Sequence, residues 1–413
     1  MMSIFFLLLL IFLFLWIGFL FGSASQCHQT VSAESSPPPL PDDIGLHQDK
    51  VSEVLAISGH RFDNDVLSFE GKLKANAEEA QSKLNDAFSD QEFTPMLQEA
   101  EDGRVRVLLL PGIPKTRTEH PRWWVHGLLL VLTLGTTTWT GAWHAGVNPI
   151  ENPASVLQGL PYSLGLLLVL GAHELGHYFT ARKHGLRVTP PFFIPVPFAL
   201  GTFGAFIKLK SLSPNRRALF DVAVAGPLAG LVFAIPALLI GLRHSELITS
   251  GAPTNWMHGG GVNVGSSLLM ALLSKLALGS ELLEGHQIAL HPLAFAGWLG
   301  LLVTALNLLP IGQLDGGHLA HALFGPAKAH AIGVASLVGI FLLAFFIWPG
   351  LLMWAIIVFW IAGTRDVPPA NDITPVGLPR RILGYATFAL LLAILLPVPH
   401  ELYQTFGLHC PYL

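Results

Sequence analysis

The chain has 413 residues, of which 52% are hydrophobic and only 12% are charged, and its mean hydropathy is +0.55. Soluble globular proteins carry about twice that charged fraction, so the composition excludes an ordinary soluble protein and predicts a membrane protein. The formal net charge of -4 indicates no class of partner. Because no basic block is interleaved with aromatic residues, we expect no nucleic-acid binding.

The N-terminal 50 residues divide into two segments. Residues 1–22 contain an apolar run without a basic start or a small-residue cleavage site. We expect a membrane anchor there, with a signal-like segment as the alternative. Residues 23–50 include the run SSPPPLPDD at 35–43. A proline-rich polar run cannot pack a core, which predicts a linker.

Residues 51–122 have the composition of a soluble protein. Alternating apolar residues predict strands at 65–73, 93–97 and 104–110, and helical spacing predicts a helix at 76–88. We therefore expect a small soluble α+β domain. It contains no catalytic triad and no metal-ligand spacing, so we predict no site within it.

Residues 123–413 are expected to form a membrane-embedded domain, because several of their apolar runs reach the roughly 20 residues that span a bilayer. The expected spans are residues 124–143, 156–180, 219–242, 293–309, 329–346, 351–361 and 383–396. With the N-terminal run, they predict a polytopic α-helical membrane protein with about seven to eight transmembrane helices. Lys and Arg gather before the first span, between the second and third, and before the last. By the positive-inside tendency, the α+β domain lies on the cytoplasmic side.

The most informative motif is HELGH, which places His173, Glu174 and His177 inside the second apolar run. Each such group costs about 2 to 3 kcal/mol or more to insert at that depth, so all three need partners. The two histidines are four residues apart and project from one helix face, where both imidazoles can reach one metal ion. Glu174 can take a proton from an attacking water, whose pKa zinc lowers towards about 7, and pass it to a leaving amine. This HExxH pattern is typical of metalloproteases.

A hydrolytic zinc site usually has three protein ligands, so a third must come from another segment. Asp315 is the candidate, because it lies where a later apolar run breaks. Gly316 and Gly317 permit the unusual backbone that turns a carboxylate towards a neighbouring helix. The alternative for Asp315 is an ordinary Asp-Gly turn at the membrane surface.

The two motifs together resemble the site-2 protease family of intramembrane zinc metalloproteases. That family combines HExxH in one span with N-x-x-P-x-x-x-x-D-G in a later one, and this chain has HELGH at 173–177 and NLLPIGQLDGG at 307–317. The similarity extends to GTFGA at 201–205 and AGPLAG at 225–230, so it covers the core region 164–320. It implies a zinc endopeptidase that hydrolyses peptide bonds in or near transmembrane segments of membrane proteins.

The resemblance also assigns roles to individual residues. His173, His177 and Asp315 would bind one zinc ion per chain. Glu174 would be the general base and acid. Asn307 would orient the substrate or stabilise the developing oxyanion.

Three further features lie near these motifs. Short apolar runs at 192–198 and 203–209 predict a hairpin, whose edge could hold an unwound substrate or which could simply plug the cavity. The spacing of Gly226 and Gly230 is interpreted as helix packing. His318 and His321 could form a second metal site, but with no further ligand nearby we expect them to be solvent-facing or interfacial.

Two other functions compete with proteolysis. Some metal transporters place His and Glu one turn apart in a span, but here the remaining spans are nearly free of ionisable groups. An inactive scaffold of the same fold is disfavoured by the presence of Glu174 and of all three ligands.

The expected partners are a transmembrane protein substrate and the lipid bilayer. The expected location is a bacterial inner membrane, with an organellar membrane as the alternative.

Overall fold

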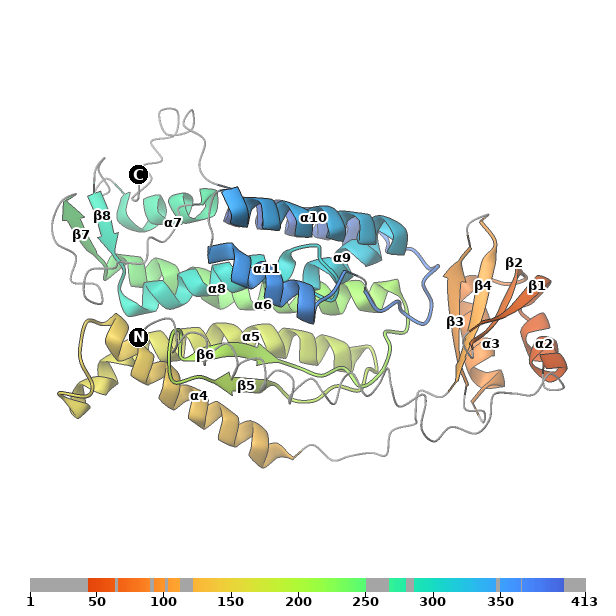
Figure 1. Ribbon diagram of the computed structural model, residues 1–413, viewed down its shortest axis with the longest axis horizontal. Coiled ribbons are helices and arrows are strands. Elements are labelled where there is room, and N and C mark those ends of the chain that lie inside the picture. The colour runs from red at the N-terminus through yellow and green to blue at the C-terminus, as the bar shows by residue number, and fades with distance from the viewer. Residues whose placement is uncertain are drawn as a thin grey trace.

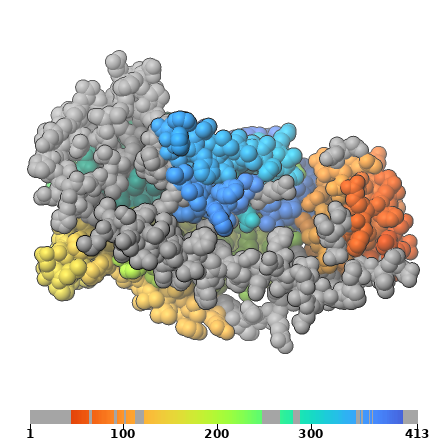
Figure 2. Space-filling model, viewed as in Figure 1, coloured from red at the N-terminus to blue at the C-terminus, as the bar shows by residue number. Residues whose placement is uncertain are grey.

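A computed structural model describes residues 44–63, 66–89, 93–100, 103–111, 122–249, 267–279, 286–346, 350–364 and 366–396. A small domain with a sheet lies at one end of the molecule, and long helices that run side by side form the rest (Figure 1). Figure 2 shows the small domain, in orange and red, against blue segments from the C-terminal half. The expected anchor at 1–22 and the proline-rich run at 35–43 lie outside the described residues.

The N-terminal domain is a four-stranded sheet with two helices. Its strands have the order β1-β2-β4-β3, and every neighbouring pair is antiparallel. The elements are α2 (Ile44–Ser52), β1 (Leu55–Asp63), β2 (Val66–Leu73), α3 (Ala77–Ala87), β3 (Phe93–Glu99) and β4 (Val105–Pro111). The three expected strands and the expected helix are confirmed. This order leaves β1 and β3 at the two edges of the sheet.

Two elements of this domain were not expected. Helix α2 begins at Ile44, inside the residues assigned to the linker, and buries Val51 against the sheet. Strand β1 contains Ser58 and Gly59, where its register with β2 shifts, and most of its side chains are exposed. An edge strand of this kind lacks the apolar alternation by which strands are predicted.

An ion pair joins β2 and β4 at the middle of the sheet. Glu70 and Arg106 are cross-strand partners, and Arg106 Nε donates to Glu70 Oε1 at 2.8 Å. This hydrogen bond lowers the pKa of the Glu70 carboxyl. The apolar core on the helix-covered side includes Phe69, Leu84 and Leu97.

The remaining helices form the membrane-embedded part. They are α4 (Trp123–His144), the short 3-10 helix η3 (Pro153–Gly159), α5 (Leu160–Lys183), α6 (Arg216–Arg243), α7 (Leu268–Leu278), α8 (Pro292–Leu308), α9 (Asp315–Phe324), α10 (Pro326–Phe346), α11 (Gly350–Ile361) and α12 (Leu378–Leu395). Each of the seven expected spans coincides with one of these helices. The structure also contains α7 and α9, which were not expected, and the strands β5 (Phe192–Pro195), β6 (Thr202–Phe206), β7 (Glu246–Thr249) and β8 (His286–Ala289).

Among the described residues, four helical segments are long and apolar enough to cross a membrane: Pro153–Lys183, Arg216–Arg243, Pro326–Phe346 and Leu378–Leu395. The chain is therefore polytopic and mostly helical, whereas the expected number of seven to eight spans is not confirmed. Helix α4 carries a run of threonines at 136–138 that lowers its hydropathy. Helices α8 and α11 have only 17 and 12 residues.

The centre of the membrane-embedded part is formed by α5, α6 and α8, which pack against one another. Their contact surfaces form one apolar cluster that includes Tyr162, Leu238 and Leu299. Helix α5 thus packs against both α6 and α8, and the residues on that face, such as Leu166 and Val169, are buried, whereas Leu168 and Leu175 on the opposite face are exposed. The hairpin of β5 and β6 confirms the predicted one, and it lies beside α5 (Figure 1).

The N-cap of α3 offers a test of the N-terminal domain. Asn76 Oδ1 accepts a hydrogen bond from the backbone N–H of Glu79 at 2.8 Å. Replacing an N-cap asparagine by alanine costs about 1 kcal/mol, so Asn76→Ala is expected to speed hydrogen exchange of the α3 amides about fivefold. Mass spectrometry of the protein in detergent would measure this. Lys83→Ala, which breaks only the exposed pair with Glu79, should have a smaller effect, and equal rates in the two variants would contradict the capping role.

Candidate metal centre

Three polar residues of α5 are buried at the centre of the membrane-embedded part. His173, Glu174 and His177 are exposed by only 4%, 7% and 7%. They lie within two turns of a helix whose other residues in that stretch are mostly apolar. As the sequence predicted, ionisable groups at this position are shielded from solvent and need partners within the protein.

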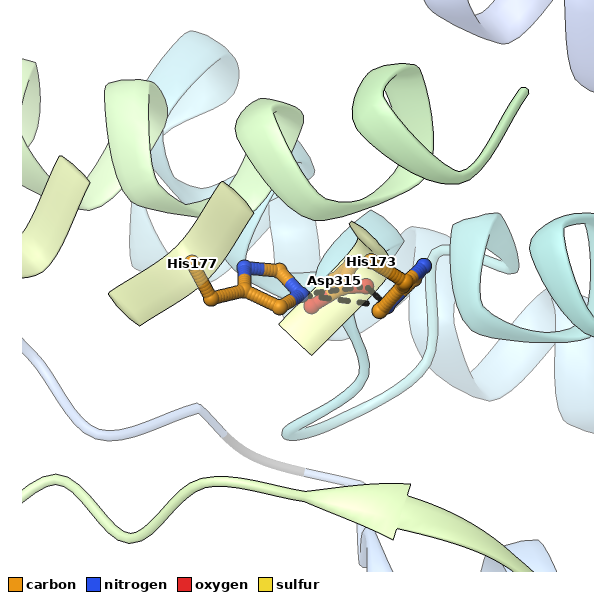
Figure 3. A group of neighbouring side chains, drawn as sticks. All are labelled: His173, His177 and Asp315. Atoms are coloured by element: carbon orange, nitrogen blue, oxygen red, sulfur yellow. Dashed lines mark hydrogen bonds and ion pairs between the residues drawn. The ribbon is translucent and has the colours of Figure 1, made fainter. Parts of the chain in front are cut away.

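Asp315, the first residue of α9, supplies a partner for both histidines. Its Oδ2 lies 3.3 Å from His173 Nε2 and 3.3 Å from His177 Nε2. The two Nε2 atoms are 3.1 Å apart. Figure 3 shows the carboxylate between the two imidazoles. The expected ligands His173, His177 and Asp315 are thus brought together from two helices, and the alternative of a surface Asp-Gly turn is wrong.

The spacing of these three atoms fits one tetrahedral zinc ion. Ligand atoms that lie about 2.0 to 2.2 Å from such an ion are about 3.3 Å from one another. Two imidazole nitrogens and one carboxylate oxygen form a common donor set for hydrolytic zinc, with a fourth position left for water or substrate. Among the described residues, this is the one cluster of His, Cys, Asp and Glu with such spacing.

The backbone of α6 fixes the protonation of one ligand. His177 Nδ1 lies 2.8 Å from the carbonyl oxygen of Val222. A carbonyl oxygen can only accept, so Nδ1 carries the hydrogen and Nε2 presents its lone pair to the metal position. The same contact holds the imidazole ring in the orientation that faces Asp315.

Gly226, one turn further along α6, leaves room for this imidazole. A Cβ atom at this position would lie 2.1 Å from His177 Nε2 and 2.4 Å from its Cε1. By contrast, a Cβ at Gly230 would lie 3.4 Å from the nearest atom of His173, which is an ordinary contact. The interpretation of both glycines as helix packing is therefore incomplete, because Gly226 also shapes the ligand site.

Asn307 and Glu174 both lie at the edge of this cluster. Asn307 Nδ2, near the end of α8, is 3.4 Å from His173 Nε2. The Glu174 carboxylate interacts with the backbone N–H of Ile207, which directly follows β6. The structure thus brings together all five residues that the sequence singled out, and it adds the end of the β5–β6 hairpin to the site.

The sequence misassigned one histidine of α9. His321 was expected to be solvent-facing or interfacial, but it is only 1% exposed. Its two ring nitrogens contact Asp366 and Asp372 at 2.9 and 3.1 Å. No motif joins these carboxylates to α9, because they come from a loop 45 and 51 residues further along the chain.

Residues 161–346 match the model of Peptidase family M50. This range includes the metal-ligand cluster and the helices that surround it. The match extends over helices α5 to α10, so the resemblance indicated by the two motifs is confirmed.

Individual relatives are named as probable zinc metalloproteases. The chain is 31% identical over 336 residues to "Probable zinc metalloprotease EGY2, chloroplastic" of Arabidopsis thaliana, an alignment that covers 80% of this chain and 59% of the relative. It is 34% identical over 259 residues to "Probable zinc metalloprotease EGY1, chloroplastic" of Oryza sativa subsp. japonica, which covers 61% of this chain and 43% of the relative. The chain thus spans about half the length of the curated relatives it matches. No solved structure matches it.

These comparisons also concern the transporter alternative and the expected location. The matched family and relatives are proteases by name, which gives no support to the metal-transporter alternative. Both relatives are named as chloroplastic, so nothing supports the expected bacterial inner membrane. Together with the candidate spans, they support an integral membrane protein.

The role of Gly226 leads to a test of the metal centre. Gly226→Ala would place a methyl group where the His177 imidazole lies, so the ring must rotate away from the Val222 carbonyl and from Asp315. We expect the purified variant to lose at least about 90% of its zinc, since loss of support for a ligand weakens metal binding about 10- to 100-fold. Plasma mass spectrometry would measure the metal. Gly230→Ala is the matched control on the same helix, and zinc retention by both variants would contradict the proposed geometry.

Proposed function

We propose that this chain is an intramembrane zinc endopeptidase that cleaves peptide bonds in or near transmembrane segments of membrane proteins. The observation that carries the proposal is the convergence of His173, His177 and Asp315 at zinc spacing, beside Glu174, inside an apolar helix bundle. The match to Peptidase family M50 and the names of the relatives support the same activity.

In this proposal the buried residues have different roles in hydrolysis. His173, His177 and Asp315 would hold the zinc ion, which would supply Lewis acidity towards water and the scissile carbonyl. Glu174 is not needed as a ligand, because three are already present. Its carboxylate takes the proton of the attacking water and then donates that proton to the leaving amine.

Asn307 is proposed to stabilise charge on the substrate. Its side-chain amide lies at the metal-facing nitrogen of His173, so its N–H groups are close to where the carbonyl oxygen of a bound peptide would develop negative charge. A fixed donor at such a position stabilises an oxyanion.

The β5–β6 hairpin is proposed to present the substrate. A transmembrane helix must unwind before its peptide bonds can be attacked, and pairing with a strand edge stabilises the unwound form. Ile207 follows β6 directly and contacts Glu174. A substrate strand along this hairpin would therefore pass beside the catalytic carboxylate.

The partners that follow from this function are a transmembrane protein substrate and the surrounding lipid. The four candidate spans support residence in a bilayer. The chloroplastic names of the relatives favour an organellar membrane over a bacterial inner membrane.

The role of Glu174 can be tested by Glu174→Gln in detergent with a purified transmembrane substrate. We expect cleavage to fall by at least about 100-fold, because general acid–base catalysis is lost. Zinc content should stay at the wild-type level, since Glu174 is not a ligand. A zinc chelator should abolish cleavage by the wild type.

Two outcomes would contradict the proposed activity. Equal cleavage by the wild type and Glu174→Gln would exclude the assigned base. Zinc flux into liposomes without cleavage of any tested membrane protein would favour a transporter.

The role of Asn307 can be tested with the similarly sized variant Asn307→Leu. We expect kcat to fall about 100- to 1,000-fold, as for loss of an oxyanion donor, with zinc retained. Thr304→Val is a matched control on α8, because Thr304 Oγ1 bonds only to the carbonyl of Gly300 in its own helix. Loss of zinc from Asn307→Leu, with the control intact, would instead show that Asn307 merely supports His173.

A further inference from the structure

One loop touches both the N-terminal domain and the helix that carries Asp315. This loop, residues 362–377, connects α11 to α12 and is described except at residue 365. At its start, the carbonyl of Ala362 accepts a hydrogen bond from Gln313 N–H at 3.0 Å. Gly312 has a φ of +47°, and a Cβ there would lie 2.2 Å from the oxygen of Ala362. The loop therefore packs closely against the turn that leads into Asp315.

Two carboxylates of the loop also hold the next turns of α9. Asp366 contacts His318 Nδ1 at 2.6 Å and His321 Nδ1 at 2.9 Å. His321 Nε2 lies 3.1 Å from Asp372. Burial raises the pKa of Asp366, but the two imidazoles lower it to about 2, so the group is a carboxylate at neutral pH.

Helix α6 anchors the second carboxylate. Arg216 Nε donates to Asp372 Oδ1 at 2.6 Å, and the Asp372 side chain is only 2% exposed. A guanidinium cannot bind a metal and would repel one, so we interpret these groups as an ion-pair network and not as a second metal site. The network fixes α9, and with it Asp315, relative to α6.

The same loop completes the sheet of the N-terminal domain. Leu97 of the edge strand β3 donates its N–H to the carbonyl of Ala370 at 2.8 Å and accepts from the N–H of Asp372 at 2.9 Å. On its other side, Asn371 pairs with Asn215, the N-cap residue of α6. Residues 370–372 thus bridge the domain and the start of α6 through backbone hydrogen bonds on both sides.

Side chains reinforce this contact. Asn371 Nδ2 donates to the carbonyl of Ala77, the first residue of α3, at 3.0 Å. Ile373 packs against the apolar core of the domain. Arg217 of α6 pairs with Glu78 of α3 at 2.7 Å, and both side chains are partly exposed.

We propose that the 362–377 loop couples the N-terminal domain to the metal centre: residues 370–372 bind the edge of β3, while Asp366 and Asp372 position α9 and hence Asp315. Asp366, Asp372 and His321 are positioning residues that act on a ligand through its helix. A displacement of the domain from the loop lowers the affinity for zinc. This inference rests on the proposed zinc site.

A charge reversal at the domain contact tests the coupling in the full-length protein. Glu78→Arg places the new arginine opposite Arg217, so the ion pair is replaced by repulsion. Because exposed ion pairs contribute up to about 1 kcal/mol, we expect the zinc affinity to fall about two- to fivefold, as measured by competition with a chelator. Hydrogen exchange in residues 312–324 should become faster. The double variant Glu78→Arg with Arg217→Glu should restore both. Glu79→Arg is the matched control, since the partner of Glu79 among the described residues is Lys83 of the same helix.

The loop carboxylate is tested by Asp366→Asn. Loss of a group bonded directly to a ligand lowers metal affinity about 10- to 100-fold. Asp366 acts on Asp315 only through α9, so we expect a smaller fall in zinc affinity, about three- to tenfold, and Asp366→Glu should recover part of it. If Asp366→Asn fails to fold, the charge-reversal set decides alone.

The outcomes separate this inference from the proposed function. Equal zinc affinity and exchange in Glu78→Arg and Glu79→Arg would overturn the coupling to the domain, and wild-type affinity in Asp366→Asn would overturn the positioning role. Absence of zinc binding or of cleavage in the wild type would instead overturn the proposed function.

Discussion

Burying His173, Glu174 and His177 in an apolar helix is costly unless partners satisfy all three groups. The surrounding elements supply those partners. Asp315 comes from α9, a backbone carbonyl comes from α6 at Val222, and Asn307 comes from α8. The mutual packing of α5, α6 and α8 therefore serves two needs at once, because it buries apolar surface and gives the two histidines in the middle of the bundle defined contacts.

Close approach between helices is the structural condition for this arrangement. The His177 ring occupies the space that a side chain at position 226 would fill, and Gly312 lets the turn before Asp315 touch Ala362 and Gly363 at the start of the 362–377 loop. In both places the missing side chain allows a polar contact that a larger residue would block. Small residues in a membrane protein are usually explained by helix packing, but here one of them also sets the geometry of a ligand.

The sequence predicted the parts of the molecule that depend on local pattern. HELGH and the Asp-Gly-Gly turn pointed to the candidate ligands, since polar residues within apolar runs need partners, and all five predicted residues lie together. Apolar runs located the long helices. Tertiary contacts were beyond such patterns: α2 and β1 are partly solvated elements without clear apolar periodicity. His321 gave no sign of its buried carboxylates, because Asp366 and Asp372 belong to a distant loop.

The pairing of β3 with residues 370–372 also constrains the order in which the molecule assembles. Domains generally fold as the chain is synthesised, from the N-terminus onwards. The N-terminal sheet can form early, but the open edge at Leu97 has no partner from this loop until the chain has been synthesised beyond Asp372. Asp366 and Asp372 belong to the same loop, so they are synthesised together with this partner of β3. A chain that has been synthesised only as far as α9 thus contains His173, His177 and Asp315 but lacks the loop that contacts α9, so under the proposed coupling the candidate site is completed only after α11.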